Sequence, residues 1–251
     1  MPDWLPAGLW GLLAGSALLI GAALGYFLHV PRRMIAAIVA FGSGVLTSAL
    51  SFELMDEAYE RGGFVSTGVG FLAGGAMYTL ANWLLCRYGA KHRKRSGGHQ
   101  PAEHEHQGSG MAIAVGALLD GIPESIVIGL SLLQGGAVGW VAVTAVFLSN
   151  LPEGLSSAAG MKQAGRSRTY IFGVWGGIAA MSGLAAIVGF TVFKGFPAGV
   201  VAGTTAVAAG AIMAMLVDTM IPEAFAEAHD LAGLVTVLGF LISFILSKSV
   251  E

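Results

Sequence analysis

Charged side chains are scarce in this sequence. Asp, Glu, Lys and Arg make up 11% of its 251 residues, and 55% of the residues are hydrophobic. A soluble domain carries about 25% charged residues, so this composition excludes an ordinary soluble domain. We therefore expect an all-α integral membrane protein that has the lipid bilayer as its surroundings and no nucleic-acid partner.

Cysteine is nearly absent as well, because Cys86 is the one cysteine in the chain. A single thiol excludes an internal disulfide, and we expect no redox role for it. Basic residues are missing from the four residues that precede the first apolar run, whereas a signal peptide carries them there. We expect that run to be retained as a helix.

Long apolar runs are what the sequence has in abundance. About 20 apolar residues are enough for a helix to cross a bilayer core, and such runs can be placed eight times in a single transmembrane domain of residues 1–251. The runs are Leu9 to Leu28, Met34 to Leu54, Phe64 to Tyr88, Met111 to Gln134, Ala137 to Met161, Thr169 to Phe193, Val200 to Met220 and Leu234 to Leu246.

The orientation of these runs follows from the basic residues, of which there are 13. With the N-terminus outside, three of them fall in outer segments: Arg61, Lys194 and Lys248. The rest fall in inner loops: Arg32, Arg33, Arg87, Lys91, Arg93, Lys94, Arg95, Lys162, Arg166 and Arg168. Cytoplasmic loops carry an excess of Lys and Arg, so we expect both termini to be extracytoplasmic. The short loops favour a bacterial inner membrane.

The one long connection, residues 89–110, is polar and contains four histidines and two glutamates. They are His92, His99, His104, His106, Glu103 and Glu105. Its composition indicates a flexible cytoplasmic loop. One interpretation is a solvated loop whose basic half sets the topology, and the other is a weak metal-collecting tether, since His-rich tracts bind transition metals.

Two of the apolar runs carry acids near their middle. Asp120 and Glu124 lie in one, Asn150 and Glu153 lie in the next, and both Asp120 and Asn150 are 15 residues from Gly135. An acid within a membrane helix is costly and is by default a functional hypothesis. If a tight turn joins the two helices, these polar clusters face each other at a similar depth.

Prolines add further oxygen ligands at the same depth. Pro123 and Pro152 cannot donate to the carbonyls of Leu119 and Leu148, which leaves those carbonyls bare. Carboxylates, amides, hydroxyls and carbonyls are the ligands of hard and borderline divalent cations. We predict one metal site here, and its candidate ligands are Asp120, Glu124, Ser149, Asn150 and Glu153.

Acids also mark the ends of two other runs, and these are lower-ranked candidates for a cation pathway. They are Glu53, Asp56, Glu57, Asp218 and Glu223. The two endings resemble each other, which suggests that helices one to three and six to eight are inverted repeats around a central pair. The alternative is that these acids are solvated helix ends at an interface.

These features resemble the ZIP family of divalent-metal transporters over nearly the whole chain. In that family helix four typically reads His-Asn-x-Pro-Glu-Gly, and helix five has a related Pro-Glu pattern. The matching stretches here are residues 120–125 (Asp-Gly-Ile-Pro-Glu-Ser) and 149–154 (Ser-Asn-Leu-Pro-Glu-Gly). The resemblance implies uptake into the cytoplasm by alternating access, with helices one, four, five and six moving against two, three, seven and eight.

The departures from the family pattern bear on the metal. The family's first metal position corresponds to Asp120, Glu124, Ser149 and Glu153. Its second position would need ligands at Gly121, Asn150 and Ala186, two of which have no ligating side chain, so we predict one main site. An all-oxygen site suits Mn²⁺ or Fe²⁺ better than a site containing imidazole does, but the family resemblance places Zn²⁺ first, with Cd²⁺ also accepted.

The expected function is therefore transport of a divalent cation, with no enzyme activity and no catalytic cofactor. The sequence is compatible with a homodimer. One rival is a monovalent-cation or proton transporter that uses the same acids. The other is an intramembrane hydrolase with Asp120 and Asp218 as an aspartyl pair, although neither aspartate lies in the Gly-x-Gly-Asp setting of such enzymes.

Overall fold

The computed structural model describes residues 2–96, 100–102, 108–134 and 136–250, and every regular element within these ranges is helical. In chain order the elements are α1 (Trp4–Phe27), α2 (Arg32–Ala49), η1 (Leu50–Met55), α3 (Asp56–Cys86), η2 (Ala90–His92), α4 (Ser109–Gln134), α5 (Gly136–Gln163), α6 (Arg168–Phe193), α7 (Ala198–Met215), η3 (Leu216–Met220), α8 (Ile221–Ala228), η4 (His229–Leu231) and α9 (Ala232–Val250).

Each predicted apolar run coincides with helix, apart from residues at the ends of two runs. Within the described ranges, five continuous helical stretches are long and apolar enough to cross a membrane: Trp4–Phe27, Arg32–Cys86, Ser109–Leu133, Arg168–Phe193 and Ala198–Ser249. Two of them, of 55 and 52 residues, are much longer than one crossing requires. These long apolar helices fit an integral membrane protein, whereas the count of eight crossings stays a prediction.

Turns of π-helix follow α2 and α7. These turns, η1 and η3, each carry an acid, Glu53 in the first and Asp218 in the second. The chain then bends inside α3 at Gly63, which has φ 67° and ψ 177°. A side chain would strain that backbone conformation, so glycine is the residue that permits the bend.

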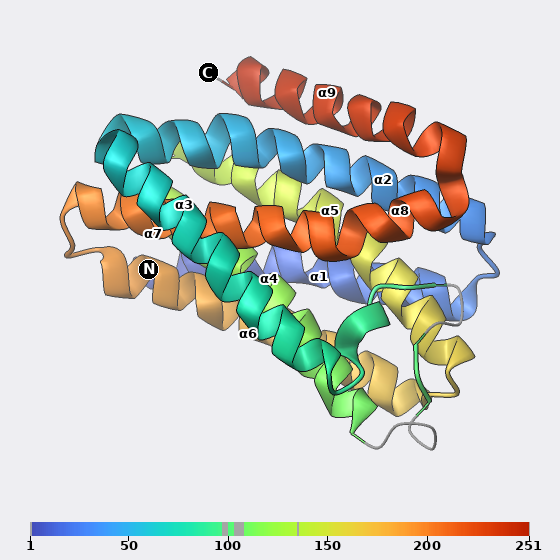
Figure 1. The fold of residues 1–251 in the computed structure, drawn as a ribbon. Helices are drawn as coiled ribbons and strands as arrows, with labels where there is room; N and C mark the ends of the chain where they lie inside the picture. Colours follow the sequence, from blue (N-terminus) through green and yellow to red (C-terminus); the bar gives the residue numbers. More distant parts are fainter. Residues whose placement is uncertain (1, 97–99, 103–107, 135, 251) are drawn as a thin grey trace.

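The helices pack in two groups (Figure 1). In one group, α1 packs extensively against α5 and α6, and α4 packs against α6. In the other, α3 packs against α7 and α2 against α9 and α8, while α2 also packs against α5 of the first group. Glycines permit these close approaches, because a Cβ at Gly154 of α5 would clash with the carbonyl of Leu18 in α1.

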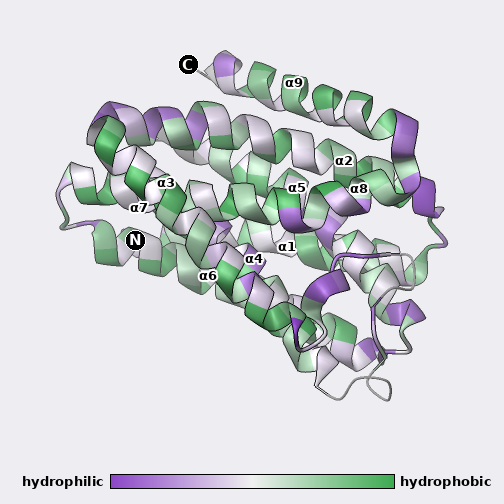
Figure 2. Cartoon of the chain, viewed as in Figure 1, coloured by the Kyte–Doolittle hydropathy of each residue, from purple (hydrophilic) through white to green (hydrophobic). Residues whose placement is uncertain are grey.

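Both chain ends lie at the same end of the bundle, and the connection between α3 and α4 lies at the opposite end (Figure 1). Hydrophobic residues dominate the helices, and hydrophilic ones are concentrated at helix ends and in that connection (Figure 2). Large apolar side chains such as Phe64, Val65 and Leu72 are mostly exposed. A membrane would supply the apolar surroundings that these side chains lack within the chain.

Candidate cation site

The acid of α4 is paired with an arginine from the connection between α3 and α4. Arg93 donates from Nε to Oδ2 of Asp120 and from Nη2 to Oδ1, both at 2.8 Å. The hydroxyl of Tyr78 in α3 also donates to Oδ1 of Asp120, at 2.5 Å. Two-pronged guanidinium–carboxylate pairs are among the strongest polar contacts in proteins, so the Asp120 carboxylate is firmly held.

Lys94 joins the acids of α4 and α5. Its Nζ lies 2.9 Å from Oε2 of Glu153 and 3.4 Å from Oδ2 of Asp120. The structure thus brings Asp120 and Glu153 to one ammonium group, at the level where the sequence analysis places facing polar clusters. Asp120 and Glu153 are almost fully buried, and so are Arg93 and Lys94, with 1% and 4% of their surface exposed.

The Lys94 amine stays charged at this position. Burial opposes its charge, but the nearby carboxylates of Asp120 and Glu153 outweigh burial and raise the pKa of Lys94 above its ordinary value. Lys94 belongs to the connection, outside the apolar helices. It is therefore a cation that a loop brings into the helix bundle.

Glu124 is the third buried acid of the site, and it forms no ion pair with Arg93 or Lys94. It lies one turn after Asp120 in α4, and only 1% of its surface is exposed. Among the described residues its Oε1 has no hydrogen-bond partner. The charges of Glu153, Lys94 and Asp120 all act on it, so it belongs to the same electrostatic cluster. A buried polar atom without a partner is costly and calls for an explanation.

The backbone around Arg93 and Lys94 is docked on α5. Ser157 donates to the carbonyl of Arg93 at 2.6 Å, and Ser156 donates to that of Lys94 at 2.5 Å. Gln100 donates from Nε2 to the carbonyls of Arg93, Arg95 and Ser157, at 2.9, 3.1 and 3.1 Å. The docking therefore uses neutral hydrogen bonds as well as the two buried cations.

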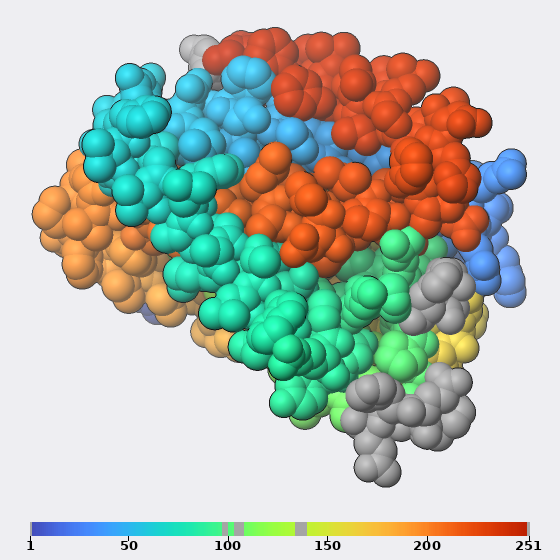
Figure 3. Space-filling view, in the orientation of Figure 1, coloured from blue at the N-terminus to red at the C-terminus, as the bar shows by residue number. Residues whose placement is uncertain are grey.

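Glu223 of α8 holds the far side of the same segment. Its Oε1 accepts from the backbone N–H of Ser96 at 2.9 Å and from the Ser96 hydroxyl at 2.6 Å, and it lies 3.0 Å from the Ser156 hydroxyl oxygen. Arg95 lies 3.6 Å from its other oxygen. In the space-filling view the green connection lies beside the orange-red α8 (Figure 3). We define the docking segment as the described residues 90–96 and 100–102.

The neutral ligands that the sequence predicts bond to backbone instead. The Ser149 hydroxyl donates to the carbonyl of Val146 at 3.0 Å, one turn back in α5. Nδ2 of Asn150 donates to the carbonyl of Ala14 in α1, also at 3.0 Å. In this structure both side chains therefore serve helix structure and helix packing.

The predicted pathway acids fall at two ends of the bundle. At the α2–α3 junction Glu53 accepts a hydrogen bond from Ser247 of α9, while Glu57 lies 3.2 Å from Arg61 and Asp56 is exposed. At the other end, near the docking segment, Asp218 accepts from Nδ2 of Asn82 at 3.1 Å, and Glu223 holds Ser96. The solvated-end interpretation thus fits the exposed Asp56 and Asp218 but not the buried Glu53 and Glu223.

Among the described residues, no group of three or more His, Cys, Asp or Glu side chains is arranged to hold a metal ion. The reason is visible at Asp120 and Glu153, whose oxygens are turned toward Arg93 and Lys94. Most of the predicted metal-collecting residues of the loop lie outside the described residues: His99, Glu103, His104, Glu105 and His106.

Arg93 and Lys94 are the residues of the site that the sequence analysis missed. They were counted as topological charges in a solvated loop, whereas the docking segment is largely buried. One signal was present. The apolar runs carry three acids at the predicted site and no Lys or Arg near them, so some countercharge had to come from a connection.

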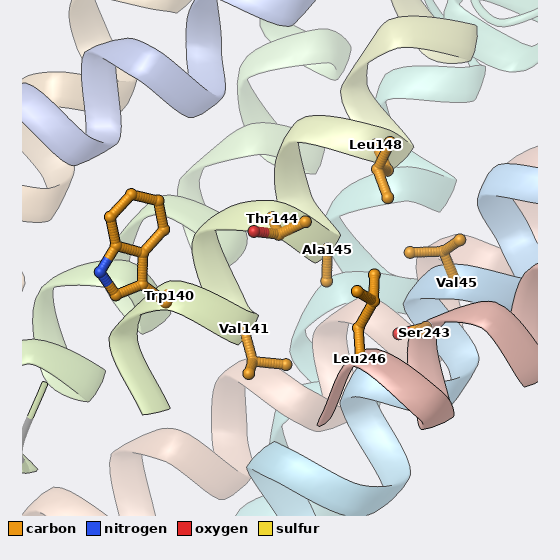
Figure 4. A pocket seen from close by; sticks show the side chains of 8 residues that line it. All are labelled: Val45, Trp140, Val141, Thr144, Ala145, Leu148, Ser243 and Leu246. Atoms are coloured by element: carbon orange, nitrogen blue, oxygen red, sulfur yellow. The ribbon is translucent and has the colours of Figure 1, made fainter. Parts of the chain in front are cut away.

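Two apolar cavities lie at the boundary between the helix groups. One, of about 330 Å³, is lined by α5, α2 and α9 (Figure 4). Trp140, Thr144 and Leu148 of α5 line one side of it, and Val45 and Ser243 line the other. The second cavity, of about 250 Å³, lies between α3, α4 and α7, beside Pro123 of α4. Each cavity thus lies between a helix of the first group and two helices of the second.

No protein-family model matches the chain, and no curated protein matches it either. The ZIP resemblance therefore rests on residues 120–125 and 149–154 together with the predicted topology.

Proposed function

We propose that the chain transports divalent transition-metal cations through the buried acids Asp120, Glu124 and Glu153, as its resemblance to the ZIP family implies. One observation carries this proposal. Three carboxylates are buried on two neighbouring helices, and their countercharge comes from a connection rather than from the helices. Such a cluster suits a binding site at which one cation replaces another, because the basic residues can leave while the carboxylates stay in place.

The charge balance favours a divalent ion. The cluster holds three carboxylates against the two cations Arg93 and Lys94. Buried carboxylates cannot remain charged without compensation in a low-dielectric interior. If the docking segment withdraws, a divalent cation supplies the lost charge, and the carboxylate oxygens supply its ligands. We rank Zn²⁺ first among the transported ions because of the family resemblance. Mn²⁺, Fe²⁺ and Cd²⁺ follow because of the ligand chemistry.

The packing supports alternating access. α1, α4, α5 and α6 form one packed group, and α3 packs with α7 and α2 with α9. One cavity lies where α5 meets α2 and α9, and the other where α4 meets α3 and α7. This division agrees with the moving groups that the resemblance implies. The acid-bearing π-turns η1 and η3 follow α2 and α7, which supports a 3+2+3 arrangement of eight helices with inverted repeats.

We further propose that the chain lies in a bacterial inner membrane with both termini extracytoplasmic. The end of the bundle with the termini would then face outward, and the docking segment would lie toward the cytoplasm. Glu53 and Glu57 would mark the outer part of the pathway, and Asp218 and Glu223 the inner part. The ion would pass between them at the central acids.

A proton or monovalent-cation transporter is the second candidate, and Glu124 favours it. A buried carboxyl without a hydrogen-bond partner at Oε1 suits a group that exchanges a proton. The same acids would then bind Lys94 in one state and H⁺ or Na⁺ in the other.

Uptake into proteoliposomes separates the two candidates. Wild-type protein should take up Zn²⁺, Mn²⁺, Fe²⁺ or Cd²⁺, and Glu153→Gln should abolish that uptake, whereas Glu60→Gln, at an exposed position, should retain it. Uptake of Na⁺ or H⁺ by folded wild-type protein, without uptake of any divalent ion, would support the second candidate and overturn the first.

A further inference from the structure

We infer that the docking segment is an autoinhibitory plug, in which Arg93 and Lys94 are tethered cations that compete with the transported ion for Asp120 and Glu153. This inference rests on the proposed function and concerns its regulation. It goes beyond that function because a transporter could also keep both basic residues in place as fixed parts of the site.

The first argument is mutual exclusion. Lys94 Nζ lies within 3.4 Å of oxygens on both Asp120 and Glu153, and Arg93 occupies both oxygens of Asp120. A metal ion bound to these oxygens would lie within a few ångströms of the ammonium group, where like charges repel strongly at low dielectric. The ion and the docked cations therefore cannot occupy the acids together.

The second argument is that the docking segment can separate from its site without the loss of a helix. The cations belong to a connection between helices and not to a helix, so they can leave without unfolding α4 or α5. The backbone is held by the Glu223 carboxylate at Ser96 and by neutral hydroxyl and amide groups of Ser156, Ser157 and Gln100. Water can replace each of the neutral hydrogen bonds at a small net cost, because the released groups bond to water instead.

The third argument concerns the route. Lys94, Arg95, Asp218 and Thr219 line one cavity of about 190 Å³ on the side of the docking segment. The docked segment thus stands between the central acids and Asp218, the acid proposed for the inner part of the pathway. With the segment docked, Lys94 separates the central acids from that cavity.

Hydrogen exchange on the unmodified full-length protein tests the plug directly. Amide exchange reports local opening, and the Ser96 amide is bonded to Glu223 only while the segment is docked. Addition of Cd²⁺ should accelerate exchange in peptides that cover residues 90–96. Cd²⁺ that binds at Glu124, as judged by loss of binding in Glu124→Gln, while residues 90–96 keep their protection would overturn the plug.

Two variants test competition by affinity. Gln100→Ala removes one hydrogen bond between the segment and α5 and two within the segment, and it leaves every charge in place. It should therefore lower the Kd for Cd²⁺ about tenfold, as expected when the competent state is more populated. Lys94→Gln should do the same. Arg33→Gln removes one positive charge at an exposed position outside the segment and should bind like wild type.

The outcomes separate the plug from the proposed function. If wild type and both variants all fail to bind Cd²⁺, the divalent site itself is refuted. If all bind with equal affinity and residues 90–96 stay protected, the site stands and Arg93 and Lys94 are fixed structural counterions. Since Gln100→Ala leaves the acid–base pairs intact, it keeps the test decisive if Lys94→Gln fails to fold.

Discussion

At the scale of single residues, the molecule solves the problem of buried negative charge with two basic side chains that come from a connection. Hydropathy and the cost of acids in apolar helices were enough to single out Asp120, Glu124 and Glu153 from the sequence. Their partners were not predictable, because Arg93 and Lys94 lie in a polar stretch without periodicity. Only tertiary contacts bring them to the acids.

Arg93 should be a major stabilising residue of the docked structure. Arg93→Gln leaves the buried Asp120 carboxylate with Tyr78 and Lys94 alone, and breaking a buried pair in this way costs about 3–5 kcal/mol. Thermal unfolding in detergent should show a large loss, and the double variant with Asp120→Asn should recover part of it. Arg87→Gln, which changes an exposed arginine stacked on Trp83, should unfold like wild type. Equal losses in the two single variants would contradict the pairing.

Lys94 leads to a prediction about pH. Because the pKa of Lys94 is raised in the folded protein, its stabilisation is complete below the unfolded pKa of about 10.4 and is lost only as pH rises through the folded value. The stability difference between wild type and Lys94→Gln should therefore be constant from about pH 6 to about pH 9. Thermal unfolding across that range measures it, and a difference that disappears by the upper limit would show that the amine is neutral there.

At the scale of elements, long apolar runs were sufficient to place the helices, since burial in a bilayer demands both length and hydrophobicity. The joints between helices were harder to predict. Residues 50–55 and 216–220 continue their helices as π-turns rather than ending them, so two predicted runs merge into one continuous helical stretch in each case. The docking of residues 90–96 depends on α5 and α8 and has no local signature.

Close packing between α1 and α5 predicts a sharp response to a single methyl group. Gly154→Ala should destabilise the protein, because the added Cβ would clash with the backbone of Leu18, which cannot move as a side chain can. Gly173→Ala in α6 adds the same group where nothing lies within 4 Å. It should be neutral or stabilising by about 0.5–1 kcal/mol, since alanine favours helix. Equal unfolding temperatures for the two variants would refute the close approach.

At the scale of the whole molecule, two helix groups meet across apolar cavities, with the charged cluster bridging α4 and α5. Which helices pack together could not be predicted from composition and periodicity, because neither reports contacts between helices. The resemblance between the acidic ends of the second and seventh runs was visible in the sequence. Their equivalence as π-turns required the structure.

A larger side chain in the cavity between α5, α2 and α9 should slow the relative movement of the helix groups more than it disturbs folding. Ala145→Leu adds apolar volume inside the cavity of about 330 Å³ between α5, α2 and α9, so the protein should keep or gain stability. If the groups move past each other, the same variant should take up divalent ions more slowly. Ala198→Leu, at an exposed position, serves as the control in the uptake and unfolding assays. Full transport by a stable Ala145→Leu protein would argue against movement at this boundary.

The most direct test of the central claim is Mn²⁺ uptake into proteoliposomes by Glu124→Gln beside wild type and Glu60→Gln. Glu124 is the acid of the cluster to choose, because its Oε1 has no hydrogen-bond partner among the described residues and neither basic residue of the plug forms an ion pair with it. We expect Glu124→Gln to fold as stably as wild type and to lose uptake, while Glu60→Gln transports normally. Unchanged Mn²⁺ uptake by Glu124→Gln would contradict a transport site at the buried acids of α4 and α5.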